Sequence, residues 1–173
     1  RYMREIAVLD NGEQVRCGPG AVGAWVDAAL QGFHKRIGPD PASIQAAEIG
    51  GIVANNASGM CCGVHENSYR TVVDLDLILA NGYRLQTGAE NAYADFAKLD
   101  AVLYQSLLSI RDRIRADAEL AAHIEKAFQA KNTVGYSLNA FLDADKPAEI
   151  VQKLVVGSEG TLAFINKATF ACV

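Results

Sequence analysis

An Asn-Gly turn between two strand-like runs is the feature that most constrains how this chain can fold. Residues 72–79, VVDLDLIL, carry apolar side chains at every second position from Val73 to Leu79, with Asp74 and Asp76 on the other face. This alternation is typical of a strand with one apolar face. Asn81-Gly82 follows and leads into residues 83–87, YRLQT. Because Asn-Gly is the strongest short signal for a hairpin turn, we predict two antiparallel strands here.

A second hairpin is predicted near the start of the sequence, where Asp10-Asn11-Gly12 joins strand-like runs at residues 2–9 and 13–17. Residues 162–170, LAFINKATF, read as a closing strand. Residues 33–70 are rich in Gly, Pro, Asn and Ser, so we predict mostly loop, with a helical turn near Ile44 to Ile49. The predicted helices span residues 21–32, residues 99–130, and residues 145–155 with Pro147 in the first turn. The pattern is α+β, an antiparallel sheet flanked by helices, and not an alternating series of strands and helices.

Residues 99–130 carry the strongest helical pattern. Apolar residues recur there at three- and four-residue spacing, which predicts one long helix with a buried stripe. The stripe consists of Leu99, Val102, Leu103, Leu107, Ile110, Ile114, Ala118, Ala121 and Ile124. Arg111, Asp112, Arg113 and Arg115 fall largely outside the stripe, so we predict that they form a solvated face.

Composition excludes several classes of protein. Half of the 173 residues are hydrophobic, which supports one folded domain with a real core. The formal net charge is −4 without clustered Lys and Arg, so nucleic acid is not an expected partner. No apolar run approaches the roughly 20 residues that a transmembrane helix needs. The four cysteines lack metal-ligand spacing, so we expect no metal site and reduced thiols in a cytoplasmic protein. They are Cys17, Cys61, Cys62 and Cys172.

Gly18, Gly20 and Gly23 form the spacing G-x-G-x-x-G between a strand-like and a helix-like run. This spacing raises the possibility of a Rossmann domain that binds a nicotinamide cofactor. Such a domain needs a parallel strand ending in an acidic residue about 20 residues further on. Asp40 has that distance, but prolines flank it on both sides, and proline cannot occupy a central strand. A tight strand-to-helix turn therefore explains the three glycines better.

Residues 38–63 form a second glycine-rich region that contains no P-loop pattern. Gly50, Gly51 and Gly59 allow a ligand to approach the backbone closely. Small neighbouring residues leave main-chain N–H groups open, and a row of such donors can bind a phosphate or pyrophosphate. Asn55 and Asn56 add side-chain amides. From chemistry alone, a phosphate-bearing cofactor and a purely structural loop are both open.

Four motifs in the same order carry a resemblance to a known family. They are PDPAS at residues 39–43, IGGIVANNASG at residues 49–59, GYSLNAFLD at residues 135–143 and VVGSEGTLAFI at residues 155–165. Together they resemble the flavin domain of FAD-linked oxidases of the vanillyl-alcohol oxidase, or PCMH, type. The D-lactate dehydrogenase and glycolate oxidase branch is the most similar. NNASGMCCG, IRDRIRADAEL and NTVGYSLNAF further resemble bacterial D-2-hydroxyacid dehydrogenases.

The resemblance implies FAD as the cofactor and names the residues of this chain that would lie against it. Residues 39–43 would lie along the FAD, the region from Gly50 to Gly59 around the pyrophosphate and the chain leading to the flavin, and residues 159–165 near the adenosine half. The implied cofactor-binding residues are Pro39, Asp40, Pro41, Ala42, Ser43, Gly50, Gly51, Ala54, Asn55, Asn56, Ser58, Gly59, Glu159, Gly160 and the backbone near Ile165.

The resemblance also implies a longer protein, of which residues 1–173 would be the second part of a PCMH-type FAD-binding domain. An upstream pyrophosphate loop and a downstream cap domain would complete the site, and the cap would supply the catalytic residues. We therefore expect no catalytic residue in this chain, and we interpret His34, His65 and His123 as surface or structural residues.

The implied activity is oxidation of a small D-2-hydroxy acid, such as D-lactate, glycolate or D-2-hydroxyglutarate, by hydride transfer to FAD. The motifs do not identify the electron acceptor. Some relatives carry an iron–sulfur cluster in a separate downstream domain, and peripheral association of the whole protein with a membrane is open. The alternatives are a non-catalytic nucleotide-binding module and a nicotinamide-binding Rossmann domain using Gly18, Gly20 and Gly23.

Overall fold

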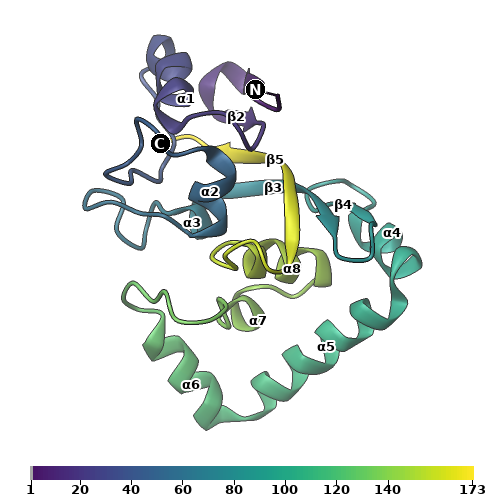
Figure 1. Cartoon of the computed structure of the whole chain (residues 1–173). Coiled ribbons are helices and arrows are strands. Elements are labelled where there is room, and N and C mark those ends of the chain that lie inside the picture. The colour runs from purple at the N-terminus through teal and green to yellow at the C-terminus, as the bar shows by residue number, and fades with distance from the viewer. Residues whose placement is uncertain (1) are drawn as a thin grey trace.

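A five-stranded antiparallel sheet organises the chain in the computed structural model, which describes residues 2–173 (Figure 1). The strand order is β1-β2-β5-β3-β4, and each pairing between these strands is antiparallel. The strands are β1 (Ile6–Leu9), β2 (Gln14–Cys17), β3 (Val72–Leu79), β4 (Arg84–Gln86) and β5 (Ala163–Ala171). The predicted α+β class is confirmed. The Rossmann alternative is wrong, because that fold is built on parallel strands.

Both predicted hairpins form, and their turns have the expected backbone. Asn11 and Gly12 adopt positive φ values of 54° and 92°, and Leu9 pairs with Gln14 across the turn. Gly82 likewise has a φ of 82°. Positive φ is the conformation that Asn and Gly tolerate best, so local turn chemistry alone explains these two hairpins.

Strand β3 departs from the predicted alternation. Its pairing with β5 shifts register between Val72 and Asp74 and again between Asp76 and Leu77. Each irregularity turns the following side chains relative to the regular pleat. Val73, predicted on the apolar face, lies at the first irregularity and is 40% exposed, whereas Leu75, Leu77 and Leu79 are buried as predicted. Asp76 is buried as well, and its carboxylate accepts hydrogen bonds from Arg84 and Asn166.

Eight α-helices are found among residues 2–173. The helices are α1 (Gly23–Leu30), α2 (Ile49–Ala54), α3 (Ser68–Thr71), α4 (Ala92–Leu99), α5 (Ala101–Ala116), α6 (Ala118–Ala127), α7 (Ala140–Asp143) and α8 (Pro147–Val155). Helices α1 and α8 match their predictions, and Pro147 stands in the first turn of α8.

Residues 33–70 are mostly loop, as predicted, but helix α2 forms at Gly50-Gly51, where only loop was expected. The predicted helical turn near Ile44 forms, since Ala46 N–H and Ala47 N–H both donate to the Ser43 carbonyl oxygen, and a separate helix, α2, starts at Ile49. Ile49, Ile52 and Val53 are completely or almost completely buried. Burial of these three side chains offsets the cost of placing two glycines in a helix, which is about 1 kcal/mol for each glycine.

The predicted single helix at residues 99–130 is wrong, because aspartates break it. The carboxylate of Asp100 accepts a hydrogen bond from the Leu103 N–H and caps α5, and Asp117 caps α6 through the Leu120 N–H. Helices α5 and α6 form a bent arm beyond the sheet (Figure 1).

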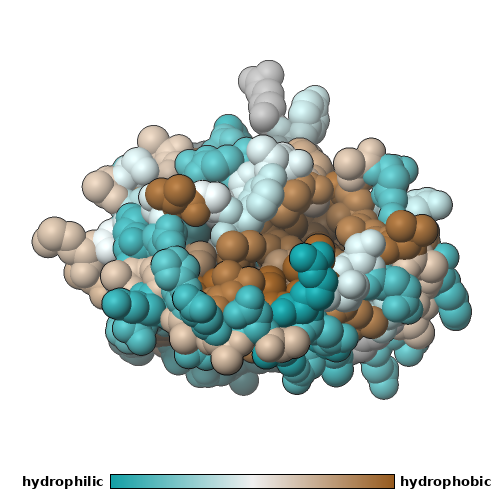
Figure 2. All heavy atoms as spheres, turned by 90° about the horizontal axis from the view of Figure 1, so that it is seen from below, coloured by the Kyte–Doolittle hydropathy of each residue, from teal (hydrophilic) through white to brown (hydrophobic). Residues whose placement is uncertain are grey.

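This arm explains why the predicted apolar stripe is only partly buried. Leu107, Ile114 and Ile124 are buried, but Val102 is 79% exposed and Ile110 40% exposed. Seen from below, the molecule gathers hydrophobic side chains in and around a hollow, with hydrophilic side chains along the rim (Figure 2).

Two arginines of α5 are not the solvated charges that the sequence predicts. Arg115 donates hydrogen bonds to the carbonyl oxygens of Phe141, Leu142 and Ala144, just after and within α7. Arg111 donates to the carbonyl oxygen of Asp145. These contacts lie about 30 residues away in sequence, so a local charge pattern could not predict them.

The core lies between the sheet and helices α2 and α8. Leu75, Leu77 and Phe170 from the sheet belong to one buried cluster with Ile52 of α2 and Ile150 of α8. The described residues contain no helix that is both long enough and apolar enough to cross a membrane.

Candidate cofactor site

The first glycine motif is a packed turn whose N–H groups are used inside the protein. Gly18 N–H donates to the Glu5 carbonyl oxygen at 2.9 Å, and Gly20 N–H to the Met3 carbonyl oxygen at 3.0 Å. A Cβ at Gly18 would lie 2.3 Å from the Met3 oxygen, so close packing accounts for that glycine. A diphosphate would find these two donors already occupied. The preferred interpretation as a structural turn is therefore supported by geometry.

The motifs at residues 49–59 and 155–165, about 100 residues apart in sequence, lie side by side. Gly157 N–H donates to the Val53 carbonyl oxygen at 3.1 Å, and Glu159 N–H donates to the Ala54 carbonyl oxygen at 2.9 Å. These acceptors are carbonyls at the C-terminal end of α2, which need partners outside the helix. Glu159 and Gly160 both adopt positive φ, at 55° and 75°. The tight bend lets the segment reach α2 before the chain enters β5.

A groove of about 250 Å³ opens where these segments meet. Its lining consists of Pro19, Gly50, Ala54, Gly160, Ala163, Phe164 and Ile165. Four of the predicted cofactor residues, Gly50, Ala54, Gly160 and Ile165, thus share one surface. None of the lining residues is titratable, and Phe164 is 52% exposed. An apolar groove with small residues and an exposed aromatic ring suits a flat ring system.

The row of free main-chain donors expected along α2 is largely absent. Gly50 N–H donates to the Pro19 carbonyl oxygen, Asn55 N–H to the Gly51 carbonyl oxygen and Asn56 N–H to the Val53 carbonyl oxygen. Gly51 itself is exposed, and a Cβ built on it meets no atom within 4 Å. Gly51 is therefore the position on α2 where a ligand could approach the backbone unhindered.

Asp40 organises the loop that follows α2. One oxygen, Oδ1, accepts hydrogen bonds from Gly59 N–H at 2.9 Å and Cys62 N–H at 3.2 Å, and Oδ2 accepts one from Cys61 N–H at 3.2 Å. Burial raises the pKa of Asp40, but the hydrogen bonds from the Cys62 thiol and these three N–H groups outweigh it and hold the pKa at about 2. The carboxylate is thus ionised and bound to its own chain.

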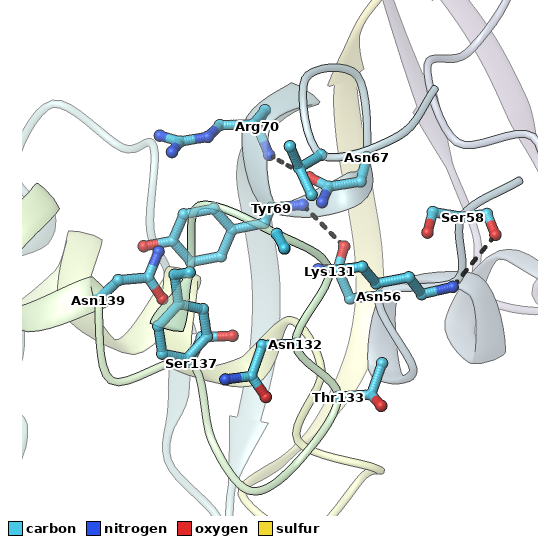
Figure 3. Close-up of a pocket in the computed structure, with 13 residues that line it drawn as sticks. Asn56, Ser58, Asn67, Tyr69, Arg70, Lys131, Asn132, Thr133, Ser137 and Asn139 are labelled. Carbon is cyan, nitrogen blue, oxygen red and sulfur yellow. Dashed lines mark hydrogen bonds between the residues drawn. The ribbon is translucent and has the colours of Figure 1, made fainter. Parts of the chain in front are cut away.

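A second, polar cavity of about 40 Å³ lies beside this loop (Figure 3). Asn139 lies in its wall, 7% exposed, and its Nδ2 donates to Asp143 at 3.2 Å. Its Oδ1 has no partner among the described residues. A cavity of this size with a free acceptor has room for a water molecule or a ligand hydroxyl group. The lining comprises Asn56, Ser58, Val64, Asn67, Tyr69, Arg70, Phe128, Ala130, Lys131, Asn132, Thr133, Ser137 and Asn139.

Two of the predicted residues, Asn56 and Ser58, line this cavity rather than the groove. The Asn56 side chain accepts a hydrogen bond from Tyr69 N–H at 3.2 Å, and Lys131 Nζ donates to the Ser58 carbonyl oxygen at 3.5 Å (Figure 3). Sequence reasoning did not select Lys131 or the other polar residues at 131–139. The motifs NTVGYSLNAF and GYSLNAFLD that carry the resemblance contain nearly all of these residues, so that signal was available.

The other predicted residues lie outside both hollows. Pro39 and Pro41 are buried, whereas Ala42 and Ser43 are exposed in the turn before α2, and Asn55 is exposed at the end of α2.

The histidines lie outside the groove as well. His34 and His123 are exposed, and His65 lines a cleft of about 560 Å³ next to Arg70 and Glu125. The four cysteines are free, and the described part of the chain contains no cluster of side chains suited to a metal ion.

The fold agrees with the comparisons with known proteins. The family described as FAD binding domain matches residues 1–88, half of the chain, and the chain belongs to this family. FAD is the cofactor that such a domain binds. The chain is also similar to the solved structure of alkyldihydroxyacetonephosphate synthase, with a TM-score of 0.54 and 17% sequence identity. The match covers 99% of this chain and 22% of the synthase chain, so the two share the fold.

Two curated relatives bear the name D-2-hydroxyglutarate dehydrogenase. The protein of Pantoea ananatis (strain AJ13355) is 29% identical over 177 residues, and that of Haemophilus influenzae (strain ATCC 51907 / DSM 11121 / KW20 / Rd) is 28% identical over 173 residues. Both alignments include 97% of this chain. The chain spans 17% of the length of each relative.

Proposed function

We propose that this chain is the FAD-binding portion of a flavoprotein dehydrogenase that oxidises a D-2-hydroxy acid, with D-2-hydroxyglutarate as the first candidate. The observation that carries the proposal is the meeting of α2 with the segment Gly157–Gly160, which creates one apolar groove from two separate motifs. The names of the two relatives support the substrate class.

When bound, FAD would supply the hydride acceptor for oxidation of the hydroxy acid at C2 to a 2-oxo acid. The residues of this chain hold and shield the cofactor in this proposal. Phe164 and Ile165 exclude water from one side of a ring, while Gly50 and Gly160 leave it room. The groove contains no titratable side chain, so the base that receives the hydroxyl proton comes from outside it.

The proposal extends to the whole protein. An upstream pyrophosphate loop would supply further donors to the diphosphate, and a downstream cap domain would supply substrate-binding and proton-transfer residues. The 17% share of the relatives' length that this chain spans leaves room for both. A cytoplasmic location, expected from the reduced cysteines, is part of the same proposal.

The test is anaerobic reduction of the full-length protein. We expect a flavin absorbance spectrum that is bleached by D-2-hydroxyglutarate and not by its L enantiomer, with D-lactate and glycolate as competing substrates. A stable flavin spectrum that no 2-hydroxy acid bleaches would favour the non-catalytic nucleotide-binding module. A full-length protein that neither contains FAD nor takes it up would contradict the proposal altogether.

A further inference from the structure

We propose that Asp40 is a positioning residue: its carboxylate holds the loop between α2 and α3 in the shape that accepts FAD, without touching the cofactor. This inference rests on the proposed function and on the expectation from the sequence that Asn55, Asn56 and Ser58 of the same loop lie against FAD. It gives Asp40 a role different from the direct contact that the motif PDPAS suggests.

The geometry shows a carboxylate committed to its own backbone. Three N–H groups, from Gly59, Cys61 and Cys62, point at the two oxygens of Asp40 within 3.2 Å. An ionised carboxylate that already accepts three donors has little capacity left for a ligand. An uncompensated negative charge would also repel a diphosphate, whereas this charge is balanced by the donors.

Gly59 fits the same interpretation. A Cβ built on Gly59 would lie 2.0 Å from the Asp40 carbonyl oxygen and 2.6 Å from Oδ1. Its φ is not positive, so the backbone conformation does not demand glycine here. Close approach of Asp40, rather than of a ligand, explains why this position has no side chain.

The Asp40 carboxylate, the anchor of the loop between α2 and α3, fixes one part of a loop that few other contacts hold in place. No helix or strand forms between Asn55 and Asn67. The carboxylate of Asp40 fastens Gly59 and Cys62, and the Asn56 side chain fastens the other part to Tyr69 N–H. Loss of the Asp40 contacts would free Ser58 and its neighbours to adopt other conformations. FAD binding would then have to order the loop again, and the free energy of this ordering would weaken the affinity.

The chain offers a matched control at Asp74. Its Oδ1 accepts a hydrogen bond from Gly88 N–H at 2.7 Å, and a Cβ at Gly88 would lie 2.8 Å from the Asp74 Cβ. Asp74 therefore fixes a turn beside a close-packed glycine, as Asp40 does. That turn follows β4, at the opposite end of the sheet from β1 and β2.

The experiment compares Asp40→Asn and Asp74→Asn in the full-length protein, with FAD removed and then titrated back. For Asp40→Asn we expect FAD affinity to fall at least tenfold. In the protein without FAD, we also expect faster amide exchange in peptides covering residues 57–63 and faster thiol labelling of the exposed Cys61. Asp74→Asn should lower the melting temperature but leave all three readouts within twofold of wild type.

A second variant, Gly59→Ala, tests the same contact from the other side and serves if Asp40→Asn fails to fold. It should reproduce the effects of Asp40→Asn, and the two changes combined should be less than additive. Weaker FAD binding with unchanged amide exchange would make Asp40 a direct ligand and overturn the proposal. Faster exchange with unchanged FAD affinity would make the anchor purely structural and overturn it too. If wild type itself binds no FAD, the proposed function fails, and this inference fails with it. Amide exchange in Asp40→Asn then still shows whether the Asp40 carboxylate holds the loop in place.

Discussion

At the scale of single residues, the glycines of the two glycine-rich regions serve different purposes. Gly18 and Gly59 are needed because neighbouring backbone approaches them, whereas Gly51 faces open space. The sequence shows these two kinds of glycine as one pattern. Only the positions of their neighbours separate a packing glycine from one that leaves room for a ligand.

This difference leads to a prediction for Gly51→Ala. Alanine is favoured over glycine in a helix by about 0.5–1 kcal/mol, so the free energy of unfolding without FAD should rise by about that amount. FAD affinity should fall, because the new methyl group occupies the open approach. Chemical denaturation and flavin titration of the full-length variant measure the two effects. Gly32→Ala, also in open space but on another element, is the control and should not change FAD binding.

Asp76 gives a prediction about pH. Its buried carboxylate accepts hydrogen bonds from Arg84 at 2.7 and 2.6 Å and from Asn166 at 2.6 Å. The hydrogen bonds from Arg84, with a smaller contribution from Asn166, outweigh burial and lower the pKa of Asp76 below 3.8. A lowered pKa stabilises the fold above the unfolded value, and this stability disappears as pH falls through the folded pKa.

We therefore expect Asp76→Asn to cost about 1–2 kcal/mol at pH 7 and progressively less below pH 4. Urea unfolding of wild type and variant across this range provides the measurement. A difference that stays constant down to pH 2 would show that the carboxylate charge does not matter for stability.

At the scale of elements, the hairpins could be predicted and helix α2 could not. Positive φ at Asn11, Gly12 and Gly82 is a local property, so the turn residues reveal it in the sequence. Helix α2 contains Gly50 and Gly51 and forms because the fold buries its other face, which no local signal announces. The break at Asp117 did have a local signal, since aspartate is a common helix cap, and the regular apolar spacing concealed it.

How much of the candidate site could be predicted depends on whether its residues belong to one continuous segment. The motifs identified both walls of the groove, because each wall is a continuous segment. The contribution of Pro19 and the separate polar cavity around Asn139 depend on segments that meet only in the folded chain. The role of Asp40 was missed for that reason as well, since its donors lie about 20 residues away.

Arg115 gives a prediction for the arm formed by α5 and α6. Its guanidinium group donates to three carbonyl oxygens and to Asp145 at 2.7 Å, a geometry that a lysine ammonium group cannot reproduce. Arg115→Lys should destabilise the protein by about 1–3 kcal/mol and speed amide exchange in α7. Arg113→Lys, at an exposed position of the same helix, should change neither. Equal effects of the two variants would mean that charge alone matters here.

At the scale of the whole molecule, an antiparallel sheet with an apolar groove should select one cofactor. FAD added to the full-length protein without cofactor at 100 times its dissociation constant should stabilise it by about 2.7 kcal/mol. NAD should give no shift, because the first glycine motif has no free donors for its diphosphate. Thermal denaturation with each nucleotide checks this. A shift with NAD alone would contradict the assignment of the groove.

The strand order has a consequence for how the protein is made. β5 comes after the other four strands in the chain, yet it lies between β2 and β3 at the centre of the sheet. While the ribosome is still extending the chain, the two earlier hairpins therefore each present an unpaired edge to the solvent. Nearly 150 residues must emerge after β2 before that edge finds its partner. Until then a chaperone, or slow association with another nascent chain, competes for the same hydrogen bonds.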